Sequence, residues 1–201
     1  MYDTCRGYRT IVLMAQNPAR RRALADAGIR VLAQEGARGL THRAVDAEAG
    51  VPRGTASNYF PTREDLVAAL VGRLGERLTP TADDLAPFAG RTPDRALLGA
   101  YLRDVVRRVR AEPQVALALL ELRLEAVRRP AVAEALGAWR RAAFADDVAF
   151  HTAAGLPGGR TELLLFHYAL DGLLLDRLTI PLDPELTVDD TVDELVARLL
   201  P

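Results

Sequence analysis

Cysteine and long apolar runs are scarce in this 201-residue chain. A single cysteine, Cys5, cannot form an internal disulfide or supply the thiolates of a zinc cluster, which excludes a disulfide-stabilised secreted domain. No apolar run approaches the ~18 residues that a membrane span requires. The apolar stretch at residues 11–15 is too short for the core of a signal peptide. These absences favour a cytoplasmic protein.

Lysine is missing altogether, because all 26 basic residues are arginine. Arginine richness alone is simply explained by genomic codon preference, so the distribution of charge is more informative. Residues 1–80 hold 12 arginines and 8 acidic residues, a net charge of +4, whereas residues 81–201 hold 14 and 19, a net charge of -5. The first part of the chain is therefore the basic part.

Strand-like alternation is also missing, and helix-forming residues dominate, so the chain is predicted to be all-α. Prolines, glycines and capping residues divide it into predicted helices over residues 17–36, 41–49, 52–60, 62–78, 93–112, 113–129, 130–154, 160–179 and 187–200. Residues 79–93 contain three prolines and mark a bend between a small N-terminal unit and the remainder.

The two short predicted helices at 41–49 and 52–60 have the outline of a helix-turn-helix, whose second helix enters the major groove of DNA. Gly50 permits the sharp reversal between them, Thr41 offers a hydroxyl cap to the first, and Pro52 fits the start of the second. The surrounding polar residues can donate to phosphates and base edges: Thr41, His42, Arg43, Arg53, Thr55, Ser57, Asn58 and Arg63. A solvated helix surface is the simpler alternative.

Residues 41–60 read T-H-R-A-V-D-A-E-A-G-V-P-R-G-T-A-S-N-Y-F. This stretch resembles the motif of the TetR family of bacterial transcriptional regulators, approximately T-x-R-x-V-A-x-x-A-G-V-x-x-G-T-x-Y-x-Y-F. The resemblance covers about residues 18–75, including T-R-E-D-L at 62–66. Asp46 stands where the motif has a packing alanine, and Ser57 where it has a tyrosine often used to reach DNA. Both departures concern operator choice more than membership.

The resemblance implies a set of DNA contacts. Thr41 and Arg43 would hold a phosphate at a helix N-terminus, and Arg53 would pair with a guanine or clamp a phosphate. The remaining members are Gly54 for close backbone approach, Thr55 and Tyr59 for phosphates, Ser57 and Asn58 for base edges or backbone, and Arg63 for a phosphate at the next helix. Tyr59 and Phe60 equally suit packing in the core.

Residues 163–175 are apolar on nearly all sides, so this helix needs a second cover besides its own core. A second copy of the chain is the economical cover, and a fully buried helix in a monomer is the alternative. The resemblance implies dimerisation through residues 160–179 and 187–200, packed as a four-helix bundle. A two-fold protein of this kind reads a palindromic site.

Regulators of this type resemble switches in which a small molecule enters the C-terminal domain and the fourth helix transmits the change. Candidate pocket residues, each of which equally suits plain core, are Tyr101, Val105, Leu120, Leu124, Trp139, Phe144 and Phe166. Glu121 and Glu125 can orient a cationic or hydroxylated ligand, but neighbouring arginines, Arg123, Arg128 and Arg129, are simpler partners.

A concentrated reactive site is not evident, since the sequence has no G-x-S-x-G, no H-E-x-x-H and no phosphate-binding glycine loop. Asp147 and His151 stand four residues apart and, with Asp146 or His167, could share a metal. An exposed ion pair or a capped core histidine is the simpler explanation. We therefore expect no catalytic residue, no metal site and no cofactor.

Together these patterns predict a ligand-responsive transcriptional regulator, most simply a repressor released from a palindromic operator by an inducer. Its partners would be double-stranded operator DNA, a second copy of the chain and an unidentified small molecule, with no membrane. We expect a disordered arm over residues 1–17, a three-helix DNA-binding domain over 18–62 and a helical-bundle ligand-binding and dimerisation domain over 63–201. A dimeric adaptor that does not bind DNA, and then a small enzyme, are the alternatives.

The start of the chain carries its own hypothesis. The regulator-like pattern begins soon after Met14, where M-A-Q-N-P-A-R-R-R resembles a natural bacterial start. We therefore hypothesise that translation begins at Met14 and that Cys5 belongs to an over-extended gene model. If the preceding residues are translated, Arg6 and Arg9 belong to an arm available to DNA.

Overall fold

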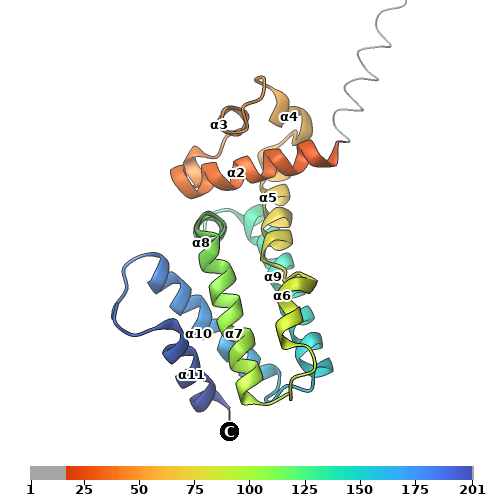
Figure 1. The fold of residues 1–201 in the computed structure, drawn as a ribbon. Helices are drawn as coiled ribbons and strands as arrows, with labels where there is room; N and C mark the ends of the chain where they lie inside the picture. The colour runs from red at the N-terminus through yellow and green to blue at the C-terminus, as the bar shows by residue number, and fades with distance from the viewer. Residues whose placement is uncertain (1–16, 201) are drawn as a thin grey trace, which may run out of the picture. The chain divides into compact units, whose positions relative to one another are not determined.

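The computed structural model describes residues 17–200, which form helices and no β-strand (Figure 1). The all-α prediction is confirmed. The helices are α2 (Pro18–Gly39), α3 (His42–Glu48), α4 (Thr55–Tyr59), α5 (Arg63–Leu78), α6 (Ala82–Leu85), α7 (Arg95–Ala111), α8 (Pro113–Ala126), α9 (Pro130–Ala153), α10 (Arg160–Leu178) and α11 (Val188–Leu199), with a short 3-10 helix, η1 (Ala86–Phe88), after α6. The hypotheses on Met14 and on the arm with Cys5, Arg6 and Arg9 lie outside the described residues.

Local backbone conformation explains where the helices differ from the sequence prediction. At Gly36, where the first helix was expected to end, φ is +68° and ψ is -175°, and one further helical turn follows this break. The helix expected from Pro52 begins only at Thr55, so that expectation was wrong. Gly54 has a φ of +89°, in the left-handed region, and the N–H of Thr55 closes a turn on the Pro52 carbonyl at 3.2 Å.

The bend expected at residues 79–93 contains α6 and η1. In α6 the Thr81 hydroxyl accepts a hydrogen bond from the Asp84 N–H, and the Asp84 carboxylate accepts one from the Thr81 N–H. This reciprocal cap satisfies backbone donors that an isolated turn would leave unpaired. Sequence reading missed these short helices because prolines surround them.

The chain divides into two compact units. Among the described residues, one unit takes residues 17–77 together with Leu117–Trp139, and the other takes Leu78–Ala116 together with residues 140–200. The long helices α8 and α9 contribute residues to both units.

In the first unit α2 packs closely against α5 because Gly28 has no side chain. A Cβ built at Gly28 would lie 2.8 Å from Cδ1 of Leu70, so only glycine allows this approach without a shift. Beside it, Arg73 of α5 donates to both carboxylate oxygens of Asp26, at 2.9 and 3.1 Å. The close packing and the ion pair together hold α5 against α2.

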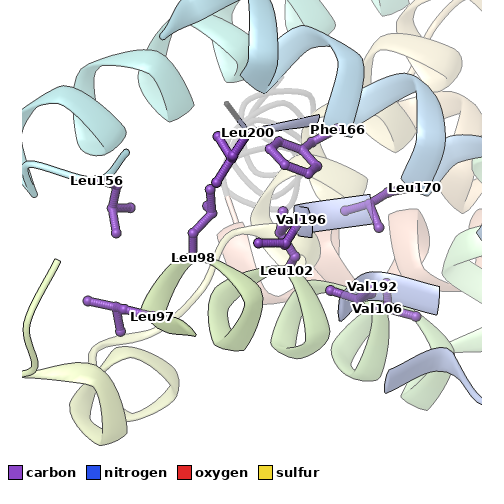
Figure 2. Packing of buried hydrophobic residues seen from close by; sticks show 10 residues of the cluster. All are labelled: Leu97, Leu98, Leu102, Val106, Leu156, Phe166, Leu170, Val192, Val196 and Leu200. Carbon is purple, nitrogen blue, oxygen red and sulfur yellow. The ribbon is translucent and has the colours of Figure 1, made fainter. Parts of the chain in front are cut away.

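The core of the second unit lies between α7, α10 and α11 (Figure 2). The buried side chains of this cluster are Leu97, Leu98, Leu102, Val106, Leu156, Phe166, Leu170, Val192, Val196 and Leu200. Phe166 is the largest of them and is 1% exposed. Within residues 17–200 no helix combines the length and apolar character that crossing a bilayer demands.

Candidate nucleic-acid interface

Short-range capping defines both ends of α3. The Thr41 hydroxyl accepts a hydrogen bond from the Ala44 N–H at 3.1 Å, as the sequence predicted. At the other end Gly50 adopts a φ of +64°, which reverses the chain just after the helix. The residues that follow lead into α4, which we call the recognition helix.

A buried carboxylate fixes the start of the recognition helix. Asp46 is 2% exposed and accepts from the N–H of Gly54 and the N–H of Ala56, both at 2.7 Å. Its backbone carbonyl accepts from the Val51 N–H at 3.0 Å. A buried carboxylate needs such charge-assisted bonds, so Asp46 organises the whole turn between α3 and α4.

The end of the recognition helix is held by two basic side chains. Nε2 of His42 lies 2.6 Å from the Phe60 carbonyl oxygen, and Arg21 donates to the Tyr59 carbonyl at 3.0 Å. The Arg21 guanidinium also lies 4.6 Å from the centre of the Phe60 ring. Tyr59 and Phe60 are 7% and 0% exposed, which supports the packing interpretation for both rings. A phosphate contact from Tyr59 stays a prediction.

Arg63 forms a second tie to the preceding chain. Its guanidinium donates to the carbonyl oxygens of Leu40 and Ala37, the latter at 2.7 Å. Its Nε is buried and has no hydrogen-bond partner among the described residues. These bonds favour a structural role for Arg63 over the expected phosphate contact, which the structure leaves as a prediction.

The exposed residues among the expected DNA contacts include Arg43 of α3, Arg53 of the turn and Asn58 of α4. Their side chains make no hydrogen bond or ion pair within residues 17–200, so their donors are available to a ligand. By contrast, the hydroxyl of Thr55 donates to the Pro52 carbonyl at 2.6 Å and that of Ser57 to the Gly54 carbonyl at 3.0 Å. The two arginines and Asn58 can therefore donate to a ligand, whereas the hydroxyl protons of Thr55 and Ser57 are already used within the turn.

Gly54 is required by its backbone conformation and not by crowding. No atom would lie within 4 Å of a Cβ built there, apart from its chain neighbours, whereas its φ of +89° disfavours any other residue. The open space beside it leaves the expected close approach of a partner geometrically possible.

Sequence reading missed the roles of Asp46, His42 and Arg21 in holding the recognition helix. Asp46 was noted only as a departure from alanine. The sequence does place an acidic residue eight positions before Gly54. This spacing predicts a hydrogen bond between Asp46 and Gly54 only if the turn is already known to fold back on α3.

The candidate ligand residues fall into both units. Leu120, Leu124 and Trp139 belong to the first unit, whereas Tyr101, Val105, Phe144 and Phe166 belong to the second. Leu124 is 56% exposed, whereas Phe166 is core.

Aromatic rings gather in the second unit around Tyr101. The ring centre of Tyr101 lies 4.4 Å from that of Phe88 and 5.4 Å from that of Phe150, the latter in an edge-on geometry. Phe150 remains 43% exposed. Among the candidates only Tyr101 takes part in this three-ring cluster, because Phe144 instead contacts the His167 ring at 5.1 Å.

The two glutamates of α8 have different partners. Glu125 pairs with Arg128 at 3.5 Å and with Arg129, the simpler of the two expected arrangements. The carboxylate of Glu121 accepts a 3.4 Å hydrogen bond from the N–H of Ala37, directly after the backbone break of α2. Glu121 therefore ties α8 to the end of α2 within the first unit.

The histidines considered for a metal are otherwise engaged. Nε2 of His167 lies 3.2 Å from a carboxylate oxygen of Asp147. His151 is 6% exposed, with Nε2 3.3 Å from the Gly158 carbonyl oxygen, so it is a core histidine. Over the described part of the chain no three His, Cys, Asp or Glu side chains are grouped to hold a metal ion.

An exposed apolar stripe runs along α10. Leu165, Tyr168 and Leu175 are 41%, 61% and 48% exposed, and a Cβ built at Gly172 would meet nothing within 4 Å. The four positions are spaced three, four and three residues apart, which is the spacing of a seam between packed helices. The opposite face of α10 supplies Phe166 to the core.

The arrangement of α3, turn and exposed α4 with free arginine and amide donors defines a helix-turn-helix protein. The chain matches the family described as bacterial regulatory proteins, tetR family, over residues 24–70. It also matches the tetracyclin repressor-like C-terminal domain over residues 93–201. It therefore belongs to the TetR family of transcriptional regulators, as the motif indicated.

Individual relatives agree with this assignment. A TetR family member from Streptomyces coelicolor A3 is 31% identical, with a TM-score of 0.68 over 92% of this chain and 99% of that chain. The multidrug binding protein EbrR, solved with imidazole, is 31% identical, with a TM-score of 0.64 over 93% of each chain. The HTH-type transcriptional regulator BetI of Rhizobium meliloti is 29% identical over 128 residues, which span 64% of this chain and 62% of BetI.

Proposed function

We propose that this protein is a repressor that binds a palindromic operator as a homodimer and is released by a small-molecule inducer. The observation that carries the proposal is the group of free donors, Arg43, Arg53 and Asn58, around a recognition helix fixed at both ends. Fixed backbone with free side chains suits readout of base edges and phosphates. A helix that only faces solvent would not need hydrogen bonds from Asp46 at its start and from His42 at its end.

The roles proposed for these residues follow from their chemistry. Arg53 precedes the recognition helix and donates to a guanine edge or to a phosphate, and Asn58 offers its amide to an adenine edge or to the backbone. Arg43 and Thr41 stand at the start of α3, where a phosphate completes the N-terminal donors. Gly54, Thr55, Ser57, Tyr59 and Arg63 complete the proposed contact surface, the last two mainly by holding it in place.

The exposed stripe on α10 supports dimerisation. Leu165, Tyr168 and Leu175 expose apolar area in one line, and Gly172 allows a second helix to approach closely. The exposed residues of α11 are mostly charged: Asp189, Asp190, Asp193, Glu194 and Arg198. We therefore propose that α10 supplies the apolar centre of a two-fold interface and that α11 contributes its rim.

The proposed inducer is a planar aromatic molecule taken up by the helical C-terminal part. EbrR has been solved with proflavin and with ethidium as well as with imidazole. In this chain the three rings of Phe88, Tyr101 and Phe150 offer stacking surfaces of the kind such molecules use. The remaining pocket candidates, Val105, Leu120, Leu124, Trp139, Phe144 and Phe166, stay predictions.

A selection from a random duplex library, followed by fluorescence anisotropy over a salt series, tests the proposal. We expect the protein to enrich a two-fold symmetric sequence and to bind it more weakly as salt rises, because phosphate contacts release counterions. Arg53→Ala should weaken binding about 5- to 150-fold if the guanidinium pairs with a base, and should lower the salt slope by about 1 if it holds a phosphate. Arg91→Ala, an exposed arginine outside the interface, is the control.

The alternatives give different results. No binding to any duplex at low salt would favour the adaptor that does not bind DNA. If Arg53→Ala and Arg91→Ala behave alike, Arg53 is not a contact. Thermal shift measurements with proflavin and ethidium test the inducer class, and release of the selected duplex by either compound would support induction.

A further inference from the structure

We infer that Asp46 is a positioning residue for DNA readout, which fixes the start of the recognition helix so that Arg53 and Asn58 face the bases in one register. The inference rests on the proposed DNA-binding function. Asp46 lies in α3 and presents no surface to a partner, since it is 2% exposed. It therefore acts through the backbone that it holds.

The geometry supports a role that is specific to the turn. Each carboxylate oxygen accepts one N–H, Oδ2 from Gly54 and Oδ1 from Ala56, at 2.7 Å. Gly54 precedes the recognition helix and Ala56 lies in its first turn. A two-pronged carboxylate fixes both the position of the helix and its rotation about its own axis, which a single cap cannot do.

In the described part of the chain, no cationic side chain pairs with the Asp46 carboxylate. Asp46 takes part in no ion pair within residues 17–200, so the backbone N–H groups of Gly54 and Ala56 are the partners of its charge. The bonds also occupy two N–H groups at the start of the recognition helix. A DNA phosphate consequently cannot use them, and recognition falls to side chains.

The hydroxyl groups next to Gly54 and Ala56 are also occupied by hydrogen bonds within the turn. Thr55 and Ser57 donate their hydroxyl protons to carbonyls of their own turn, at 2.6 and 3.0 Å. Arg53 before the helix and Asn58 within it, by contrast, keep free side-chain donors. The direction in which those two side chains leave the backbone depends on Gly54 keeping its φ of +89°. Asp46 holds that residue directly.

The test compares Asp46→Ala and Asp46→Asn with the wild type in parallel selections from one random duplex library. Asn keeps one acceptor but turns an amide N–H toward the second backbone N–H, so it should retain part of the effect. Asp94→Ala is the matched control, because Asp94 also caps a helix through one backbone N–H, of Leu97 at 2.9 Å, but at α7. Circular dichroism and amide exchange of Gly54 and Ala56 report the folded state of each protein.

Asp46→Ala should bind the selected duplex about 10-fold or more weakly while its affinity for an unrelated duplex changes little, and its selected sequences should lose base preference. Asp46→Asn should fall between the two, and it carries the comparison if the alanine variant does not fold. Asp94→Ala should keep the wild-type preference. Unchanged preference in both Asp46 variants, or equal loss on both duplexes, would overturn the inference.

A wild type that enriches no sequence would instead overturn the proposed function, and this inference with it. A wild type that selects an operator, with variants that select the same one equally well, overturns only the role of Asp46. The two failures are therefore distinguishable in one experiment.

Discussion

Placing a charge on the exposed stripe of α10 should dissociate the proposed dimer. Tyr168 is the most exposed of the three large apolar residues on the stripe, at 61%. Tyr168→Glu removes that apolar surface and places a carboxylate on a seam that would be desolvated. In a two-fold interface the change occurs twice.

The exposed fractions set the magnitude. Complete burial of a large apolar side chain contributes about 1.5–3 kcal/mol. With 41%, 61% and 48% of Leu165, Tyr168 and Leu175 still exposed, their burial in a dimer would contribute about 4–10 kcal/mol over both protomers. That is comparable with the about 4–15 kcal/mol that association costs in lost freedom, so the dimer depends on the stripe.

Loss of Tyr168 alone should cost the dimer about 2–4 kcal/mol, counted over both protomers. This corresponds to an increase in the dimer dissociation constant of about 30- to 700-fold. Sedimentation velocity over a range of protein concentrations measures it directly. Binding to the palindromic duplex should weaken in parallel, because a monomer engages one half-site.

Val127→Glu provides the control, because Val127 is 84% exposed in the connection between α8 and α9 and receives the same charge. Circular dichroism should show unchanged helix content for both variants. A Tyr168→Glu protein with the wild-type dissociation constant would refute the argument. Equal dissociation of both variants would also refute it, since the effect would then not belong to α10.

Further predictions concern the two units separately. Gly28→Ala should lower stability by about 1–3 kcal/mol, since its Cβ would lie 2.8 Å from Leu70, and thermal melting should show a Tm decrease of about 2–4 °C per kcal/mol. Arg177→Ala should speed proteolysis of residues 179–187, because Arg177 donates to two carbonyls of that loop at 2.9 and 2.6 Å, and an unchanged cleavage pattern would contradict this. The hydroxyl and the N–H of Thr62 donate to the Asp65 carboxylate and lower the pKa of Asp65 in the folded protein. The ionised carboxylate therefore stabilises the fold at pH values above the unfolded-state pKa, about 4. This contribution to the free energy of unfolding is lost as the pH falls through the lower pKa of the folded state. Urea unfolding of Asp65→Asn should therefore differ from the wild type at neutral pH and converge with it in acid.

Local signals made the helices predictable from sequence. Thr41 as a hydroxyl cap, Gly50 after the last turn and the broken helix at Gly36 each depend on neighbours within a few residues. The start of α4 was misplaced because Pro52 is a good first residue for a helix, whereas Gly54 in the left-handed region delays it.

Side-chain contacts between segments distant in sequence could not be predicted from such local signals. Arg63 looked like a phosphate ligand from its place at a helix start, yet it donates to carbonyls more than twenty positions earlier. His42 has its partner in Phe60, and Glu121 has its partner in Ala37, which lies 84 residues away. A polar side chain looks free in a sequence until the fold brings an acceptor to it.

Some polar side chains of the helix-turn-helix hold the backbone of α4, whereas others have no partner among the described residues. A recognition helix of five residues, α4, cannot hold its own conformation, because so short a helix has few internal hydrogen bonds. Asp46 binds its first turn, while His42 and Arg21 bind its last carbonyls. These three side chains are thus used to hold the backbone of α4. In the proposed function, the few exposed donors would then discriminate between sequences without the entropic cost of ordering the helix on binding.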